Sequence, residues 1–347
     1  MMGVVTKVSV ALLLLAPATG VAEHSQSRSL GDEQFMQQRY REAQITLWKC
    51  VASGTETPDE AVNLASTYRE IKNYDEGLAR VRDEMKRRHG DEDLIYMGAF
   101  LQFRRGEFEN SVALLNLAYK LNPNDWRLHQ LYALNYVEAG WASAAEQEFN
   151  RAITLKSDLP ELYYQLARYY YTMSAFGKAV TASEKALALA PQYADAYDNL
   201  GLTYAGLGNY SASADNFEKA IKLNQEHNVR DEWPLVDYGA SLEDHDPNQA
   251  MELLQEAVQM NSANATAYYE LGRTMQNLGR DSDAEINLRE AIIHDPTYTN
   301  AYYILSALAR KRGDRVASTK YMAEFKRLRD QEKKDKIFDQ ILSMRHR

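Results

Sequence analysis

Apolar, aromatic and small residues return along this chain with a period of 34 residues. In one stretch the recurring positions hold Leu200, Gly201, Tyr204, Phe217 and Ala220. The same residue types recur at Tyr163, Leu166, Ala167, Tyr170, Phe176, Ala179, Ala186 and Pro191, and again at Tyr268, Leu271, Gly272, Met275, Gly279, Ala284, Leu288, Ala291 and Pro296. A period of this size is typical of an array of small helical units rather than of one compact domain. The pattern therefore predicts an all-α fold.

Turn residues divide each period into two helices. A glycine lies between the two apolar stretches of five units, at Gly106, Gly140, Gly208, Gly279 and Gly313. Glycine adopts the left-handed conformation that commonly ends a helix. Proline, which cannot continue a helix, follows the second stretch at Pro123, Pro191 and Pro296. Each unit is therefore expected to be a helical hairpin.

This order of aromatic, Leu-Gly, Tyr, small, aromatic, small and Pro positions resembles the tetratricopeptide repeat. The resemblance implies a right-handed superhelical solenoid of antiparallel helix pairs, with about eight repeats plus a C-terminal capping helix. We expect an array over residues 58–330, with units starting near residues 58, 92, 126, 160, 194, 231, 265 and 299. Residues 23–57 are expected to form an N-terminal helix or degenerate repeat, and residues 331–347 a basic C-terminal helix.

Small residues occupy three matching positions when the chain is aligned to the repeat. In the second helices they are Gly77, Ser111, Ala145, Ala179, Ser213, Ala250, Ala284 and Ser318. In the first helices they are Ala65, Ala133, Ala167, Gly201, Gly272 and Ser306, and a third set is Ala118, Ala152, Ala186, Ala220, Ala257 and Ala291. Two helix backbones can approach closely only where a side chain is absent or tiny. These positions are therefore expected to be buried between helices.

Two regions depart from the regular repeat. The spacing grows by three residues between Asn224 and Trp233, and that unit carries Asp246-Pro247 where others have a turn glycine. We expect a longer connection there and a local change of superhelical pitch. At the C-terminus, apolar residues at Ile337–Leu342 are expected to cover the open face of the last unit. A helix that binds a partner is the alternative.

The N-terminus has the pattern of a secretory signal. Lys7 precedes an apolar run from Val8 to Ala16, and small residues follow as far as Ala22. We predict a signal peptide over residues 1–22, cut after Ala22 or alternatively after Ala18. A membrane anchor is the other interpretation, but the apolar run is shorter than the roughly 20 residues that span a bilayer. The mature chain is thus expected to lack a membrane span and to be exported, periplasmic or secreted.

Charge and cysteine content limit the kinds of partner to be expected and exclude an internal disulfide. The chain has 40 Lys and Arg against 49 Asp and Glu, but residues 310–347 hold 13 basic against 6 acidic residues. The acidic body disfavours nucleic acid and anionic membranes as main partners. The basic end is interpreted as a solvated capping helix, or alternatively as a site that docks on an acidic surface. The single Cys50 cannot form an internal disulfide and is expected to be a small buried hydrophobe.

No motif for catalysis or for a cofactor stands out. The seven histidines are scattered without metal-ligand spacing, and no nucleophile motif, phosphate-binding loop or dinucleotide fingerprint occurs. We therefore expect no enzymatic activity, no metal and no cofactor.

The resemblance also implies where a partner binds. In this family the concave wall is lined by first helices, and proteins or peptides commonly lie along it. The exposed positions of these helices carry over to Tyr164, Arg168, Tyr171, Asn199, Tyr269, Arg273, Gln276, Asn277, Tyr303 and Arg310. The alternative for the tyrosines is that some of them pack against the neighbouring unit. Tyr and Arg are frequent at binding hot spots, and Arg168 and Arg273 are expected to pair with carboxylates or with a peptide backbone. The expected function is a non-catalytic scaffold that binds a protein or peptide; the alternatives are a structural subunit of a cell-envelope assembly and an accessory arm of an enzyme complex.

Overall fold

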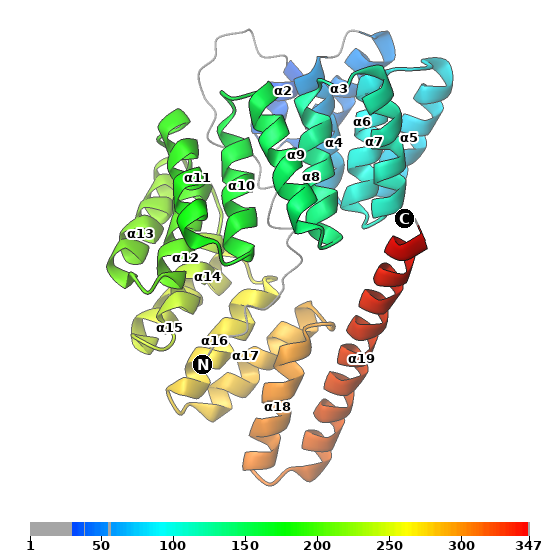
Figure 1. Ribbon diagram of the computed structural model, residues 1–347. Coiled ribbons are helices and arrows are strands. Elements are labelled where there is room, and N and C mark those ends of the chain that lie inside the picture. The colour runs from blue at the N-terminus through cyan, green and yellow to red at the C-terminus, as the bar shows by residue number, and fades with distance from the viewer. Residues whose placement is uncertain (1–29, 38, 55–56, 346–347) are drawn as a thin grey trace. The chain divides into compact units, whose positions relative to one another are not determined.

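The computed structural model describes residues 30–37, 39–54 and 57–345, and the regular structure of these residues is entirely helical (Figure 1). The first helices of the pairs are α4 (Pro58–Glu70), α6 (Glu92–Arg104), α8 (Trp126–Glu138), α10 (Pro160–Thr172), α12 (Ala194–Gly206), α14 (Trp233–Leu242), α16 (Ala265–Asn277) and α18 (Thr299–Lys311). The second helices are α5 (Tyr74–Arg87), α7 (Phe108–Leu121), α9 (Ala142–Leu155), α11 (Phe176–Leu189), α13 (Tyr210–Glu226), α15 (Pro247–Met260), α17 (Asp281–His294) and α19 (Arg315–Arg345). The predicted signal peptide lies outside the described residues.

The chain forms two compact units, which divide between Tyr193 and Ala194. The first unit contains α2 (Leu30–Met36), α3 (Tyr40–Ser53) and the four pairs from α4 to α11, and the second contains the four pairs from α12 to α19. Within each unit the two helices of a pair pack against each other, and each pair packs on the next. The expected all-α architecture of stacked helix pairs is confirmed. None of the helices in the described ranges is long and apolar enough to cross a bilayer.

Small side chains allow the helices of each pair to approach closely. The positions that the sequence assigned to small residues are buried, apart from Ser318, which is half-buried. A Cβ atom added to Gly201 would lie 2.7 Å from the ring of Phe217, and one added to Gly272 would lie 2.7 Å from the side chain of Leu288. Such distances are below van der Waals contact, so a larger residue would push the two helices apart.

The turns inside the pairs have the left-handed residue that the glycines predicted. Gly106, Gly140, Gly208, Gly279 and Gly313 have φ angles of 81°, 74°, 74°, 73° and 87°. In two other pairs the same place is taken by Lys72, with φ 52°, and Ser174, with φ 56°. The α14–α15 turn uses another device, because the side chain of Asp246 accepts a hydrogen bond from the backbone N–H of Gln249 and caps α15.

The three extra residues near Asn224 lengthen a helix as well as a connection. Helix α13 has 17 residues, whereas α5, α7, α9, α11, α15 and α17 each have 14. Leu223 is 2% exposed and Asn224 is 7% exposed, so continuing the helix keeps both residues in the interior. The expectation of a longer connection alone was therefore incomplete. The connection that follows contains Asn228 with a φ of 54°.

The last helix is continuous from Arg315 to Arg345. Residues 331–345 continue α19 rather than starting a helix of their own. The first part of α19 packs on α18, with ring centroids 6.4 Å apart for Tyr302 and Tyr321 and 5.3 Å apart for Tyr303 and Phe325. The side chains of Ile337–Leu342, which were expected to cover the last unit, lie outside the described residues.

Candidate functional site

Four of the ten side chains expected on an open binding surface are buried. Tyr164, Arg168, Asn199 and Tyr269 are 3%, 6%, 0% and 6% exposed. The ring of Tyr164 lies 5.2 Å from that of Tyr193, and the ring of Tyr269 lies 4.7 Å from that of Tyr298. A first helix is flanked by its own second helix and by the adjacent pairs, so a long side chain on its flank is covered by those neighbours. The expectation that these four side chains are exposed was therefore wrong.

The other six side chains are at least partly open. Tyr171 and Gln276 are half-buried, and Asn277 and Arg310 are exposed. Tyr303 is 54% exposed, and the side chain of Arg273 is 37% exposed. Five of the six come from the consecutive first helices α16 and α18. We call Arg273, Gln276, Asn277, Tyr303 and Arg310 the α16–α18 face.

Arg273 is already paired with two carboxylates. Its guanidinium forms an ion pair with Glu243 of α14 and a 2.8 Å ion pair with Glu270 of its own helix. The amide nitrogen of Asn277 donates a 3.0 Å hydrogen bond to Glu243. We call Glu243, Glu270, Arg273 and Asn277 the Arg273 cluster. Because this arginine is engaged inside the protein, the expectation that it pairs with a partner's carboxylate finds no support in this geometry.

The carboxylates of the Arg273 cluster are more buried than the cation that neutralises them. The side chains of Glu243 and Glu270 are 7% and 8% exposed. Burial raises the pKa of Glu270 from 4.5 to about 7, and the positive charge of Arg273 only partly offsets the effect. Burial likewise raises the pKa of Glu243. The cluster can therefore take up a proton close to neutral pH.

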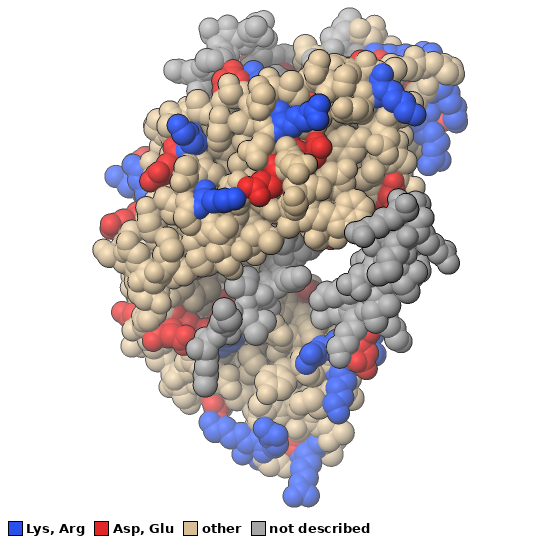
Figure 2. Space-filling view, viewed as in Figure 1, with Lys and Arg blue, Asp and Glu red and all other residues tan. Residues whose placement is uncertain are grey.

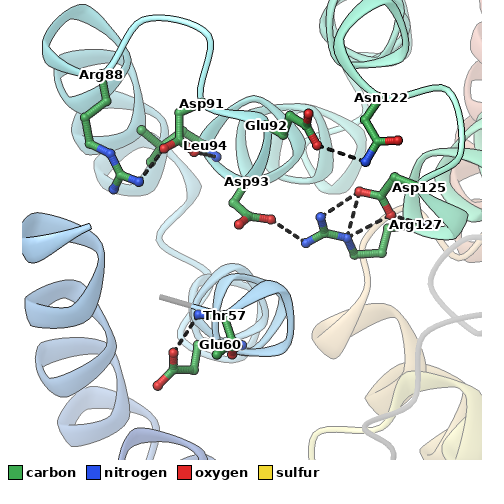
Figure 3. Close-up of polar contacts among 10 residues, drawn as sticks. All are labelled: Thr57, Glu60, Arg88, Asp91, Glu92, Asp93, Leu94, Asn122, Asp125 and Arg127. Atoms are coloured by element: carbon green, nitrogen blue, oxygen red, sulfur yellow. Dashed lines mark hydrogen bonds and ion pairs between the residues drawn. The ribbon is translucent and has the colours of Figure 1, made fainter. Parts of the chain in front are cut away.

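A second arginine cluster lies in the first unit (Figure 3). Arg127 of α8 forms 2.6 Å ion pairs with Asp93 of α6 and with Asp125, which precedes α8. The guanidinium also lies 5.1 Å from the centre of the Tyr96 ring. Asp125 accepts a 2.9 Å hydrogen bond from the backbone N–H of Arg127 and so caps the helix. We call Asp93, Asp125 and Arg127 the Arg127 cluster.

The Arg127 cluster holds its cation firmly. The side chain of Arg127 is 5% exposed. Burial disfavours its charge, but the hydrogen bonds and negative charges of Asp125 and Asp93 outweigh this penalty and raise the pKa of Arg127. This cluster was not predicted from the sequence, although Asp93 and Arg127 lie one 34-residue period apart. That spacing places them on neighbouring first helices and is the signal that could have revealed the contact.

Polar side chains join further first helices of the first unit. The amide of Gln130 donates a 3.0 Å hydrogen bond to Gln165, whose own amide donates a 2.9 Å bond to Glu161. The hydroxyl of Tyr193 donates to the same Glu161. These groups are buried and bonded to one another, which indicates a structural role.

The described residues contain no group of three or more His, Cys, Asp or Glu side chains that could hold a metal ion. His129 is 1% exposed and has Glu148 at 2.6 Å and the carbonyl of Pro123 at 3.0 Å, so it connects α8 with α9 and with the preceding turn. Cys50 is half-buried rather than fully enclosed.

Comparison with known protein families supports the same fold. Residues 160–193, 194–227 and 241–310 each match a family model described as tetratricopeptide repeat. The chain is 25% identical over 195 residues to human Protein O-mannosyl-transferase TMTC3, a match that covers 56% of this chain and 20% of that protein. It is 24% identical over 260 residues to human Superkiller complex protein 3, covering 72% of this chain and 16% of that protein. The chain thus spans a fifth or less of the length of these relatives.

Two solved structures show the same helical architecture. Yeast Tom70 matches with a TM-score of 0.62 and 14% identity, covering 97% of this chain and 70% of that one. The Cut9–Hcn1 hetero-tetramer of APC/C matches with a TM-score of 0.60 and 16% identity, covering 83% of this chain and 56% of that one. At such identities the likeness shows the fold alone. The family matches within residues 160–310, together with the stacked helix pairs of both units, identify tetratricopeptide repeats in this chain.

Proposed function

We propose that this chain is a non-catalytic scaffold that binds a protein or peptide through first helices of its repeats, chiefly at the α16–α18 face. The observation that carries the proposal is that five polar and aromatic side chains, each at least partly exposed, lie on two consecutive first helices. The sides of α16 and α18 that face α17 and α19 are closed by packing, as the buried Leu271, Leu305 and Leu308 show. We therefore place the partner on the α16–α18 face rather than on those two sides.

The side chains of this face suit an extended peptide. Gln276 and Asn277 carry amides, which can both donate hydrogen bonds to a peptide backbone and accept them. Tyr303 is 54% exposed and is supported from below by the ring of Phe325 at 5.3 Å, so it offers a large contact area in a fixed position. Among the described residues, no carboxylate lies within ion-pair distance of Arg310. A supported tyrosine beside an available arginine is typical of a binding hot spot.

The comparisons supply limited support of a second kind. The Cut9–Hcn1 structure is a hetero-tetramer, so this fold is found in at least one protein assembly. Two further parts of the proposal come from the sequence: the signal pattern of residues 1–22 supports export to the periplasm or the medium, and the acidic body disfavours nucleic acid. Absence of catalysis is part of the same proposal.

Affinity capture tests the α16–α18 face. The tagged chain and a Gln276→Ala, Tyr303→Ala, Arg310→Ala variant are used to capture proteins from an extract of the exported fraction, with quantitative mass spectrometry. We expect the variant to lose at least about tenfold of the enriched partner, because hot-spot truncations each cost about 1–2 kcal/mol or more.

The matched control changes three exposed residues of second helices, Asn150→Ala, Lys185→Ala and Tyr210→Ala. It should capture the partner as the unmodified chain does. Equal capture by all three proteins, with unchanged circular dichroism, would rule out the α16–α18 face as the binding surface.

A further inference from the structure

Charge is divided unevenly within the second unit. Residues 194–265 contain 13 Asp and Glu against 3 Lys and Arg, whereas residues 310–331 contain 8 Lys and Arg against 3 Asp and Glu. Figure 2 shows red carboxylates gathered over α15 and blue side chains gathered at the turn between α18 and α19. One unit therefore presents an acidic region and a basic region at different places.

The acidic region has a defined outer surface. Asp215 and Glu218 of α13 and Glu252 and Glu256 of α15 are all exposed, and we call these four residues the acidic surface. Glu252 and Glu256 are four residues apart and so share one face of α15. No Lys or Arg in the described part of the chain lies within ion-pair distance of the four carboxylates.

The three cations of this region are directed elsewhere. Lys219 lies 6.0 Å from the centre of the Tyr197 ring, and Lys222 pairs with Glu226 at 3.6 Å. Arg230 donates a 3.1 Å hydrogen bond to the carbonyl of Met260. No cation among the described residues therefore forms an ion pair with the acidic surface.

The basic region carries a matching stripe on α19. Arg315, Lys326 and Arg329 are exposed, and spacings of 11 and 3 residues place them on one face of the helix. We call these three residues the basic stripe. Three other cations of this end have internal partners, since Lys311 pairs with Asp281, Arg312 with Glu285, and Arg327 with Glu324. No carboxylate among the residues whose side chains are described pairs with the basic stripe.

The basic stripe borders an aromatic contact surface. The guanidinium of Arg329 lies 5.4 Å from the centre of the Phe325 ring, which in turn packs on the exposed Tyr303. Charged groups steer two proteins together, and aromatic and arginine side chains supply contact area once they meet. The stripe thus has both features of a docking site.

We infer that the basic stripe of one copy of this chain docks on the acidic surface of a second copy. A second copy is assigned as the partner by charge complementarity, because the chain carries both an acidic and a basic surface. Within one copy, α16 and α17 lie between α15 and α18–α19 in the stack (Figure 1), so α13 and α15 are not neighbours of α19. The two surfaces differ, so each copy keeps one unused surface after the first contact. Association can therefore continue beyond a dimer.

Sedimentation of the full chain tests this inference. Between about 0.1 M and about 1 M NaCl the Debye length falls from about 10 Å to about 3 Å, so exposed charges lose most of their attraction. We expect the average mass to rise with protein concentration at the lower salt, and the association to be at least about tenfold weaker at the higher salt. A chain that is monomeric at both salts over the micromolar range would overturn the inference.

Charge reversal on each surface gives the sharper test. Glu252→Lys, Glu256→Lys removes the acidic surface, and Lys326→Glu, Arg329→Glu removes the basic stripe. Each variant alone should associate at least about tenfold more weakly, because its reversed surface has the same charge as the surface on which it would dock. An equal mixture should associate again, because each variant supplies the surface that the other has lost.

A control variant separates local from global charge. Glu109→Lys, Glu184→Lys makes the same change in net charge as Glu252→Lys, Glu256→Lys, but on exposed positions of α7 and α11, and should associate like the unmodified chain. Loss of association in this control, undiminished association of either reversed variant alone, or a mixture that stays monomeric would each contradict docking between these surfaces. Circular dichroism verifies that every variant is folded.

Discussion

The Arg127 cluster of the first unit and the Arg273 cluster of the second each combine one guanidinium with two carboxylates. The guanidinium is the most buried group in the first cluster and the least buried in the second. Each places one guanidinium between two carboxylates from neighbouring first helices or their caps. In the first unit the side chains of Arg127, Asp125 and Asp93 are 5%, 8% and 21% exposed. In the second unit the arginine is 37% exposed and its two glutamates are 7% and 8% exposed.

The difference indicates that the response of such an ion-pair cluster to pH depends on whether the arginine or the carboxylates are the more buried. A guanidinium does not lose its proton at physiological pH, so burying it fixes a permanent cation that must stay paired. A carboxyl group can become neutral when it is buried, and the raised pKa of Glu270 reflects this. The Arg127 cluster is thus a fixed connection between helices, whereas the Arg273 cluster responds to pH.

The largest expected effect is the loss of the buried cation. Arg127→Met keeps most of the side-chain volume but leaves Asp125 buried beside no positive charge. We expect a destabilisation of about 3–5 kcal/mol, because removing one member of a buried ion pair leaves an uncompensated charge. Chemical denaturation followed by circular dichroism measures it. A loss below about 1 kcal/mol would show that the cluster behaves as a surface pair.

The pH dependence of stability should come next in size. Glu270 has a pKa of about 7 in the folded chain and an ordinary value of 4.5, so between these values the folded state holds a proton that the unfolded state has released. Stability should therefore fall as pH rises from about 4.5 to about 7, by on the order of 3 kcal/mol. Glu270→Gln, which cannot titrate, should flatten denaturation midpoints measured across this range. A variant with the same pH profile as the unmodified chain would contradict the assignment.

Arg273→Met should separate the two clusters further. At pH 8 the change leaves two buried carboxylates without their cation, and we expect a loss of roughly 1–3 kcal/mol. At pH 5 protonation can relieve the repulsion, so the loss should be smaller. Arg127→Met should show no comparable reduction at the lower pH. Equal losses for Arg273→Met at both values would mean that the glutamates do not take up protons.

The smallest effect is expected for an exposed pair in the first unit. Arg105 and Asp75 form a 2.7 Å ion pair, with side chains that are 43% and 85% exposed. Solvent screening limits such pairs to about 0–1 kcal/mol. Arg105→Met therefore serves as the control for Arg127→Met, and a large loss here would mean that the assay reports something other than burial.

The helix pairs could be predicted from the sequence because their packing depends on local residue types that repeat. Ala145 is fully buried, and Gly201 lies in a close contact that no larger residue fits; the small size of both residues is visible in the sequence. The left-handed turn at Gly208 is likewise visible in the sequence, because the turn favours a glycine. These requirements recur in every pair, and the recurrence makes them detectable.

The binding surface was less predictable, because exposure depends on residues from other pairs. Tyr164 and Tyr269 occupy first-helix positions that the family leaves open, but Tyr193 and Tyr298 cover them. The partner of Arg273 was also hidden: Glu243 lies 30 residues earlier, in the unit whose spacing departs from the 34-residue period. Because Glu243 and Arg273 are not separated by the 34-residue period, aligning the repeats does not place these two side chains on neighbouring helices at matching positions.

The turns at Lys72 and Ser174 leave room for an easy gain. Both residues adopt a backbone conformation in which a Cβ atom is crowded, at a cost of roughly 1 kcal/mol each, while five other pairs use glycine there. Selection removes only those variants that fall below the stability needed for function, so stabilising substitutions of this kind commonly remain available in natural proteins. Lys72→Gly and Ser174→Gly are therefore two substitutions with which a more stable version of this array could be started.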